Sequence, residues 1–257
     1  MANIKIAVIN ASTVLTDALV KAAVPALQTQ VHRDFAPAWG VDADLSFVPK
    51  GESPDPGAWW LVILDTSDAA GALGYHDLTN EGLPLGKVFA KSDIDLGYAW
   101  TVTASHELLE MLGDPDINLT AFVEYTDKSG ILYAYEVCDA CEADDLGYKI
   151  DSILVSDFVF PSWFESFRKK GSTQFDFGNK IQSPFELLPG GYIGSYDVAS
   201  GSGWHQVTAQ GQAFKYEMRA RIGSRRERRR TPREHWLQSE VVPARVGASG
   251  LPAGLGR

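Results

Sequence analysis

The sequence has little cysteine and no long apolar run, and each shortage excludes a class of protein. Its 257 residues include two cysteines, which are too few for a four-cysteine zinc site. No stretch approaches the roughly 18 apolar residues of a transmembrane helix. Residues 1–13 lack the basic start, apolar stretch and small-residue cleavage site of a secretory signal. We therefore expect a soluble protein without membrane association.

The two cysteines, Cys138 and Cys141, lie between the acidic residues Glu136, Asp139 and Glu142. A redox C-x-x-C motif needs an electropositive setting that stabilises the thiolate. The neighbouring carboxylates would instead raise the pKa of both thiols. Two interpretations stay open: a local disulfide, or two plain thiols near an acidic site.

The net charge of −10 is unevenly distributed along the chain. Residues 1–217 contain 13 basic and 30 acidic residues, whereas residues 218–257 contain ten arginines and three glutamates. The acidic body argues against a general nucleic-acid binder, because phosphate backbones attract basic surfaces. Seven arginines fall between residues 219 and 230, a run typical of a flexible interaction tail. Such a tail would bind a protein assembly or nucleic acid, or fold back on the acidic body.

Hydrophobic patterns in the first hundred residues alternate between strand and helix. Strands are predicted at 4–10, 44–49 and 59–65, and again within 71–90 after a glycine-broken extended segment. A long helix is predicted over 13–37, with its cap near Ser12 or Thr13.

The next segment, from residue 92, is predicted to be a loop that runs into a helix ended by Gly113 and Pro115. The apolar residues expected to face the core from this helix are Trp100, Val102, Leu108, Leu109 and Leu112.

The later sequence is richer in strand and turn patterns. Short strands are predicted at 131–137, 147–150 and 153–160, and a short helix at 161–170. The aromatic residues expected in the core are Trp59, Trp60, Phe158, Phe160, Trp163 and Phe164. The pattern predicts an α/β (α+β) protein with three parts. These are a main domain over 1–170, a β- and loop-rich extension over 171–217 that packs on it, and the arginine-rich flexible tail over 218–257.

The stretch "SHELLEML" carries an H-E-x-x-E pattern on the expected helix. His106 and Glu110 are four residues apart and project from one face, with Glu107 about 100° around the helix. In H-E-x-x-H peptidases this spacing gives two zinc ligands and a general base between them. Glu110 in place of the second histidine keeps the reach and supplies an oxygen ligand. We expect one divalent metal, zinc first, with Ca²⁺ and Mn²⁺ as alternatives.

A third ligand must come from another part of the chain. Asp116 lies ten residues after His106, with Gly113 at plus seven, as in extended H-E-x-x-H-x-x-G-x-x-H/D peptidases. Asp114 is one turn beyond Glu110. The downstream candidates are Glu136 and Asp139. The spacing does not choose among them.

Together, "ASHELLEMLGDP" and "YEVCDACE" make residues 98–164 resemble zincin-like proteins. These proteins carry S-H-E-x-x-E-x-x-x-D/N-P followed by E-I/V-x-D-x-C, and they include bacterial and phage proteins and the plant phosphate-induced (exordium-like) proteins. The resemblance implies a zincin-like fold, a mixed twisted sheet with an active-site helix. The chain departs from metzincins at Glu110, and it lacks an evident Met-turn because Met218 is its only late methionine.

The resemblance also implies roles for individual residues. His106 and Glu110 would be metal ligands, and Glu107 the general base. Glu136 is the preferred further ligand, and Asp139 would either coordinate the metal or orient His106.

Residues 74–90, just before the helix, suit the edge strand that zincins place above their cleft to hold a peptide. Gly74, Tyr75 and His76 would form this substrate strand. His76 could polarise a substrate carbonyl there, but a surface histidine is the favoured interpretation.

These residues predict a metal-dependent hydrolase, a peptidase in which Glu107 deprotonates a metal-bound water. Its substrate would be a peptide or protein. The alternative is a non-catalytic structural or interaction protein, for example a phage-particle component built on a degenerate zincin fold. A calcium-stabilised binding module over 114–151 is a third hypothesis. The expected location is the cytoplasm or a phage-like particle.

Overall fold

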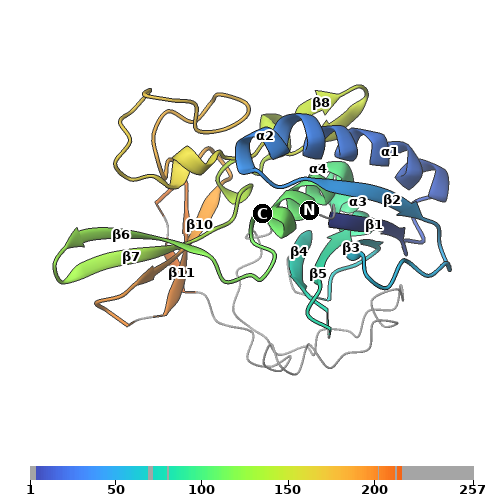
Figure 1. Ribbon diagram of the computed structural model, residues 1–257, viewed down its shortest axis with the longest axis horizontal. Coiled ribbons are helices and arrows are strands. Elements are labelled where there is room, and N and C mark those ends of the chain that lie inside the picture. The colour runs from blue at the N-terminus through green and yellow to red at the C-terminus, as the bar shows by residue number, and fades with distance from the viewer. Residues whose placement is uncertain (1–3, 69–71, 80, 202, 212, 216–257) are drawn as a thin grey trace.

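The computed structural model describes residues 4–68, 72–79, 81–201, 203–211 and 213–215 (Figure 1). The arginine-rich tail lies outside the described residues. The architecture is a mixed α+β fold in which two five-stranded sheets lie on either side of a central helix. No helix among the described residues is both long enough and apolar enough to cross a membrane.

The first sheet has the strand order β2-β1-β3-β5-β4. Four strands are parallel, and β4 runs antiparallel to β5 at one edge. The strands are β1 (Ile4–Asn10), β2 (Ala43–Val48), β3 (Trp59–Leu64), β4 (Gly74–Leu78) and β5 (Pro84–Phe89). Alternate side chains of β1 and β3 enter two separate apolar clusters, one on each face of the sheet. Both faces are therefore covered, as parallel strands require.

The helix predicted over 13–37 begins later and changes its hydrogen bonding along its length. It consists of α1 (Asp17–Thr29), a π-helical turn (Gln30–Phe35) and α2 (Ala36–Trp39). Thr16 caps it by accepting from the backbone N–H of Leu19. The predicted cap at Ser12 or Thr13 is wrong, because both residues instead bind the carboxylate of Asp65, more than 50 residues away.

The segment before the central helix is not only a loop, as predicted, but contains α3 (Ala90–Leu96). The central helix, α4 (Trp100–Gly113), is buried over residues 101–112. All its predicted core residues are confirmed, with Trp100 packed on the cluster as a half-buried residue. The helix ends as predicted at Gly113, where a Cβ atom would lie 2.7 Å from a methyl group of Val137.

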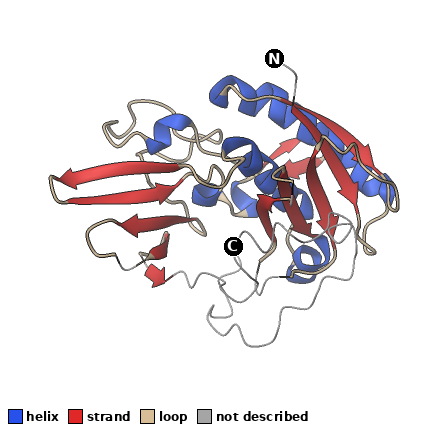
Figure 2. Cartoon of the chain, turned by 60° about the horizontal axis from the view of Figure 1, so that its bottom comes forward, coloured by secondary structure: helices blue, strands red, loops and turns tan. Residues whose placement is uncertain are grey.

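The second sheet is antiparallel, with the order β12-β11-β10-β7-β6. Its strands are β6 (Thr120–Thr126), β7 (Ser129–Ala134), β10 (Tyr192–Asp197), β11 (Trp204–Thr208) and β12 (Ala213–Lys215). Figure 2 shows this sheet standing apart from the first. It joins strands from both sides of residue 170, so the predicted boundary there does not separate the two sheets.

Three predictions for the later segments need correction. The strand predicted at 131–137 ends at Ala134, and the one at 153–160 is reduced to β9 (Ile153–Val155), which pairs with β8 (Tyr148–Ile150). The short helix at 161–170 is a single 3₁₀ turn, Pro161–Phe164. Strand β6 was not predicted, because its alternating residues are largely exposed. The core placement of the six aromatic residues is confirmed for four of them, whereas Trp59 and Phe160 are half-buried and pack against the core.

Candidate metal centre

The centre is built where α4 packs against the edge of the first sheet. Two glycines let the helix approach β4 and β5 closely. A Cβ atom at Gly74 would lie 2.8 Å from Cγ of Glu107 and would also collide with its carboxylate, and one at Gly86 would lie 3.4 Å from its Cβ. Glu107 is therefore held against the sheet, and the next turn of the helix carries Glu110.

His76 is buried, so its interpretation as a surface histidine is wrong. It lies two residues after Gly74 on β4 and so on the same face of the strand, which packs on α4. Its side chain is 7% exposed. Nδ1 lies 3.4 Å from Oε2 of Glu110 and 3.8 Å from Oε2 of Glu107, and Nε2 lies 3.6 Å from Oε2 of Glu136.

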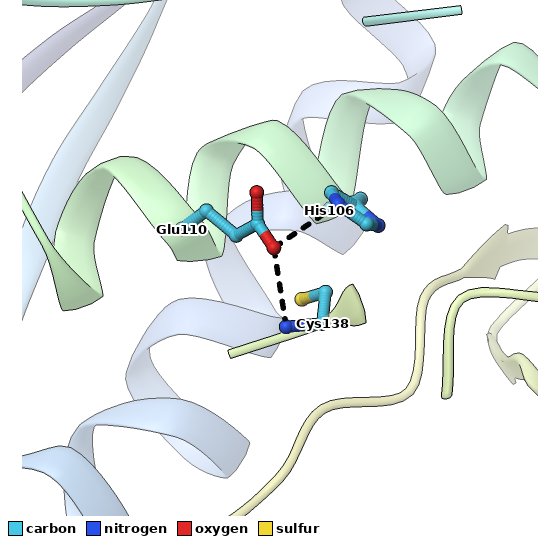
Figure 3. Close-up of side chains that lie close together, drawn as sticks. All are labelled: His106, Glu110 and Cys138. Atoms are coloured by element: carbon cyan, nitrogen blue, oxygen red, sulfur yellow. Dashed lines mark hydrogen bonds and ion pairs between the residues drawn. The ribbon is translucent and has the colours of Figure 1, made fainter. Parts of the chain in front are cut away.

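His106 lies between two carboxylates. Its Nε2 atom is 3.1 Å from Oε1 of Glu110 and 3.3 Å from Oδ1 of Asp139. The same Oε1 atom of Glu110 accepts a long hydrogen bond of 3.4 Å from the backbone N–H of Cys138 (Figure 3). Glu110 thus connects the helix, the edge strand and the segment after β7.

That segment supplies the downstream acidic residues. It leaves the second sheet after β7 and runs beside α4, where Glu136 is followed by a 3₁₀ turn, Asp139–Cys141. Val137 anchors it, because its carbonyl accepts from Val159 and its methyl group touches Gly113. The six residues His76, His106, Glu107, Glu110, Glu136 and Asp139 are called the α4 cluster below.

The described residues contain three groups whose potential ligand atoms all lie within 4.8 Å of one another. These are His106–Glu110–Cys138, His76–Glu110–Glu136 and His106–Asp139–Glu142. The four ligand residues predicted from the sequence each appear in at least one group. His76 was assigned to the substrate strand instead, because its burial depends on the strand's position against α4.

The two reserve ligands, Asp114 and Asp116, join none of these groups. Asp114 is buried, but its oxygens accept from the backbone N–H groups of Asn118 and Leu119 at 3.1 and 2.9 Å. It therefore closes the turn after α4. Asp116 is exposed.

Burial and mutual charge shift the pKa values within the α4 cluster. Burial raises the pKa of Glu107, and His76 and His106 only partly oppose this effect. Burial also acts to raise the pKa of Glu110, but the adjacent His106 and His76 lower it below its usual value. Burial, followed by the negative charge of Glu110, raises the pKa of Asp139 to about 7.

The remaining members shift strongly. Burial raises the pKa of Glu136 well above its usual value, in spite of His76. Burial would lower the pKa of both histidines, but the carboxylates around them raise it well above the usual range.

Both cysteines are free thiols, so the disulfide interpretation is wrong. Burial raises the pKa of each thiol well above its usual value, and nearby carboxylates act in the same direction, as the sequence predicted. Neither thiol has the electropositive surroundings of a reactive cysteine.

Two surface cavities, of about 430 and 160 Å³, lie away from the α4 cluster. Phe160, Pro161 and Phe177 line the larger one, and residues at the end of β1 line the smaller. No protein-family model, curated protein or solved structure matches this chain.

Proposed function

We propose that the protein is a divalent-metal-dependent hydrolase of zincin-like fold whose most favoured substrate is a peptide. The observation that carries the proposal is the position of Glu107. It lies on α4 between the two potential ligands His106 and Glu110 and faces the edge strand β4. It is buried, and its Oε2 atom has no hydrogen-bond partner. An antiparallel edge strand beside the helix that carries the H-E-x-x-E pattern supports the zincin-like assignment.

The chemistry and spacing of the side chains fit a metal. Two ligand atoms about 2.1 Å from a tetrahedral zinc ion lie roughly 3.4 Å apart. The separations of His106 from Glu110 and Asp139, 3.1 and 3.3 Å, are close to this value. Imidazole nitrogen with carboxylate oxygen suits zinc, whereas calcium prefers oxygen alone. We assign His106 and Glu110 as ligands, with the third from Asp139, which faces His106, or from Cys138, which is grouped with both.

A metal in this position would polarise a substrate carbonyl and make a bound water more acidic. Glu107 would accept the proton from the attacking water and pass it to the leaving amine. Its raised pKa suits both steps, because a carboxylate of ordinary pKa holds a proton poorly near neutral pH. Strand β4, at the edge of its sheet, would align an extended peptide by adding it as a further strand.

The burial of the α4 cluster favours a second candidate function, a structural metal centre in an interaction protein. The side chains of His76, His106 and Glu107 are only 6–10% exposed. A closed centre of this kind would stabilise the fold without catalysis. It predicts that metal removal lowers the melting temperature, and that Glu107 can be neutralised without loss of function.

The Glu107→Gln variant tests the proposed hydrolase. We expect it to keep its metal, because the base is not a ligand, and to lose at least about a hundredfold in hydrolysis of a fluorogenic peptide library, the range of general-base contributions. Glu124→Gln, an exposed position on β6, is the matched control. Full activity of Glu107→Gln would refute the assignment of the base.

A further inference from the structure

Glu110 presents its two oxygens to two different histidines. Oε1 faces Nε2 of His106 at 3.1 Å, and Oε2 faces Nδ1 of His76 at 3.4 Å. The side chain is 5% exposed, so water competes little for either oxygen. A carboxylate with one oxygen in each of two ligand groups is the usual bridge of a two-metal site, in which the ions are about 3.5–4 Å apart.

The side of Glu110 that faces β4 already has the ligands for an ion. His76, Glu110 and Glu136 form one of the three groups with ligand atoms within 4.8 Å of one another. Nε2 of His76 and Oε2 of Glu136 are 3.6 Å apart, and both are buried atoms without a hydrogen-bond partner. Unsatisfied buried polar atoms are costly. A cation bound by Nε2 of His76 and Oε2 of Glu136 would satisfy both atoms, and one ligand atom of each of His76, Glu110 and Glu136 lies within 4.8 Å of the others.

The charge of the α4 cluster supports the same conclusion. Its ion pairs among the described residues all join a carboxylate to a histidine. Histidines that bind a metal are neutral. No lysine or arginine of the described residues pairs with these carboxylates, so bound cations would take the place of the histidines as their counter-charge.

We propose a second divalent-cation site formed by His76, Glu110 and Glu136, with Glu110 bridging it to the ion at His106. The site accepts a borderline cation such as Zn²⁺, Mn²⁺ or Co²⁺, because its ligands are one imidazole and two carboxylates. It goes beyond the single ion of the proposed function and depends on it only through the shared Glu110. His76 thereby becomes a ligand from the strand that was predicted to hold substrate.

Metal stoichiometry tests the second site without an activity assay. The full chain, stripped with a chelator, would be titrated with Zn²⁺ or Co²⁺ against a chromophoric chelator. We expect two equivalents per chain for the wild type, and one each for His76→Gln, Glu136→Gln and His106→Gln. Glu110→Gln should weaken both ions at least about tenfold, the loss typical of altered metal-site residues. His32→Gln, which removes a histidine 40% exposed on the surface, should still bind two.

Circular dichroism establishes that each variant is folded, and Glu136→Gln tests the same ion independently of His76. If the wild type binds a single equivalent and His76→Gln still binds it, the second site is overturned and the hydrolase proposal stays intact. If the wild type binds a single equivalent and both His76→Gln and His106→Gln lose it, the second site is also overturned, because both histidines would then bind the same ion. Absence of any binding would overturn both proposals.

Discussion

Gly74 is a point of close contact between the edge strand β4 and helix α4, and Gly74→Ala should therefore be destabilising. In a strand, glycine is normally less favourable than alanine by about 0.5–1 kcal/mol. Without close packing, the substitution would raise the free energy of unfolding. In this protein the added Cβ would lie 2.8 Å from Cγ of Glu107 and 2.8 Å from a methyl group of Thr103, and it would collide with the Glu107 carboxylate.

The expected magnitude follows from the cost of overpacking. Inserting a methyl group into a well-packed site costs about 1–3 kcal/mol. In a domain of this size, that loss lowers the melting temperature by roughly 2–12 °C. Thermal unfolding followed by circular dichroism measures it. The shift of β4 away from α4 should also move His76 away from Glu110, so metal affinity should fall with stability.

Gly57→Ala is the matched control, because the nearest atom to its added Cβ, Oδ1 of Asp55, is at an ordinary 3.5 Å. It should change stability by less than about 0.5 kcal/mol. Equal or higher stability of Gly74→Ala relative to the wild type would refute the close contact between β4 and α4.

Two further predictions concern groups outside the α4 cluster. Burial and the neighbouring Asp176 raise the pKa of Asp157 to about 7, so the folded state holds a proton that the unfolded state releases near pH 4. Its contribution to stability is therefore lost between about pH 4 and 7, and Asp157→Asn should flatten the decline in stability over this range in urea titrations. An unchanged pH profile would contradict the shift. Both thiols are fully buried, so a thiol reagent should label neither cysteine in the native protein and both in guanidinium chloride; rapid native labelling would contradict their burial.

The sequence predicted those parts of the fold that local chemistry determines. Strands β1 and β3 follow from their apolar runs, and the end of α4 follows from Gly113, where Val137 leaves no room for a side chain. The start of α1 was misplaced, because the hydroxyl groups of Ser12 and Thr13, which were interpreted as caps, donate to Asp65. That interaction joins residues far apart in the chain.

The same distinction applies to the candidate site. His106, Glu107 and Glu110 were predicted because a helix fixes their spacing. His76 could be placed only once the edge strand was seen to pack on α4. The sequence contained one signal for this position. Gly74 and His76 are two residues apart and so share one face of the strand, and a glycine in a strand indicates close approach of another element.

The most direct test of the proposed metal centre is elemental analysis of the purified protein beside its His106→Gln variant. The account predicts at least one zinc per chain in the wild type and a loss of at least one in the variant, with His32→Gln unchanged. Absence of metal from the wild type after incubation with zinc, or the same metal content in all three proteins, would contradict it.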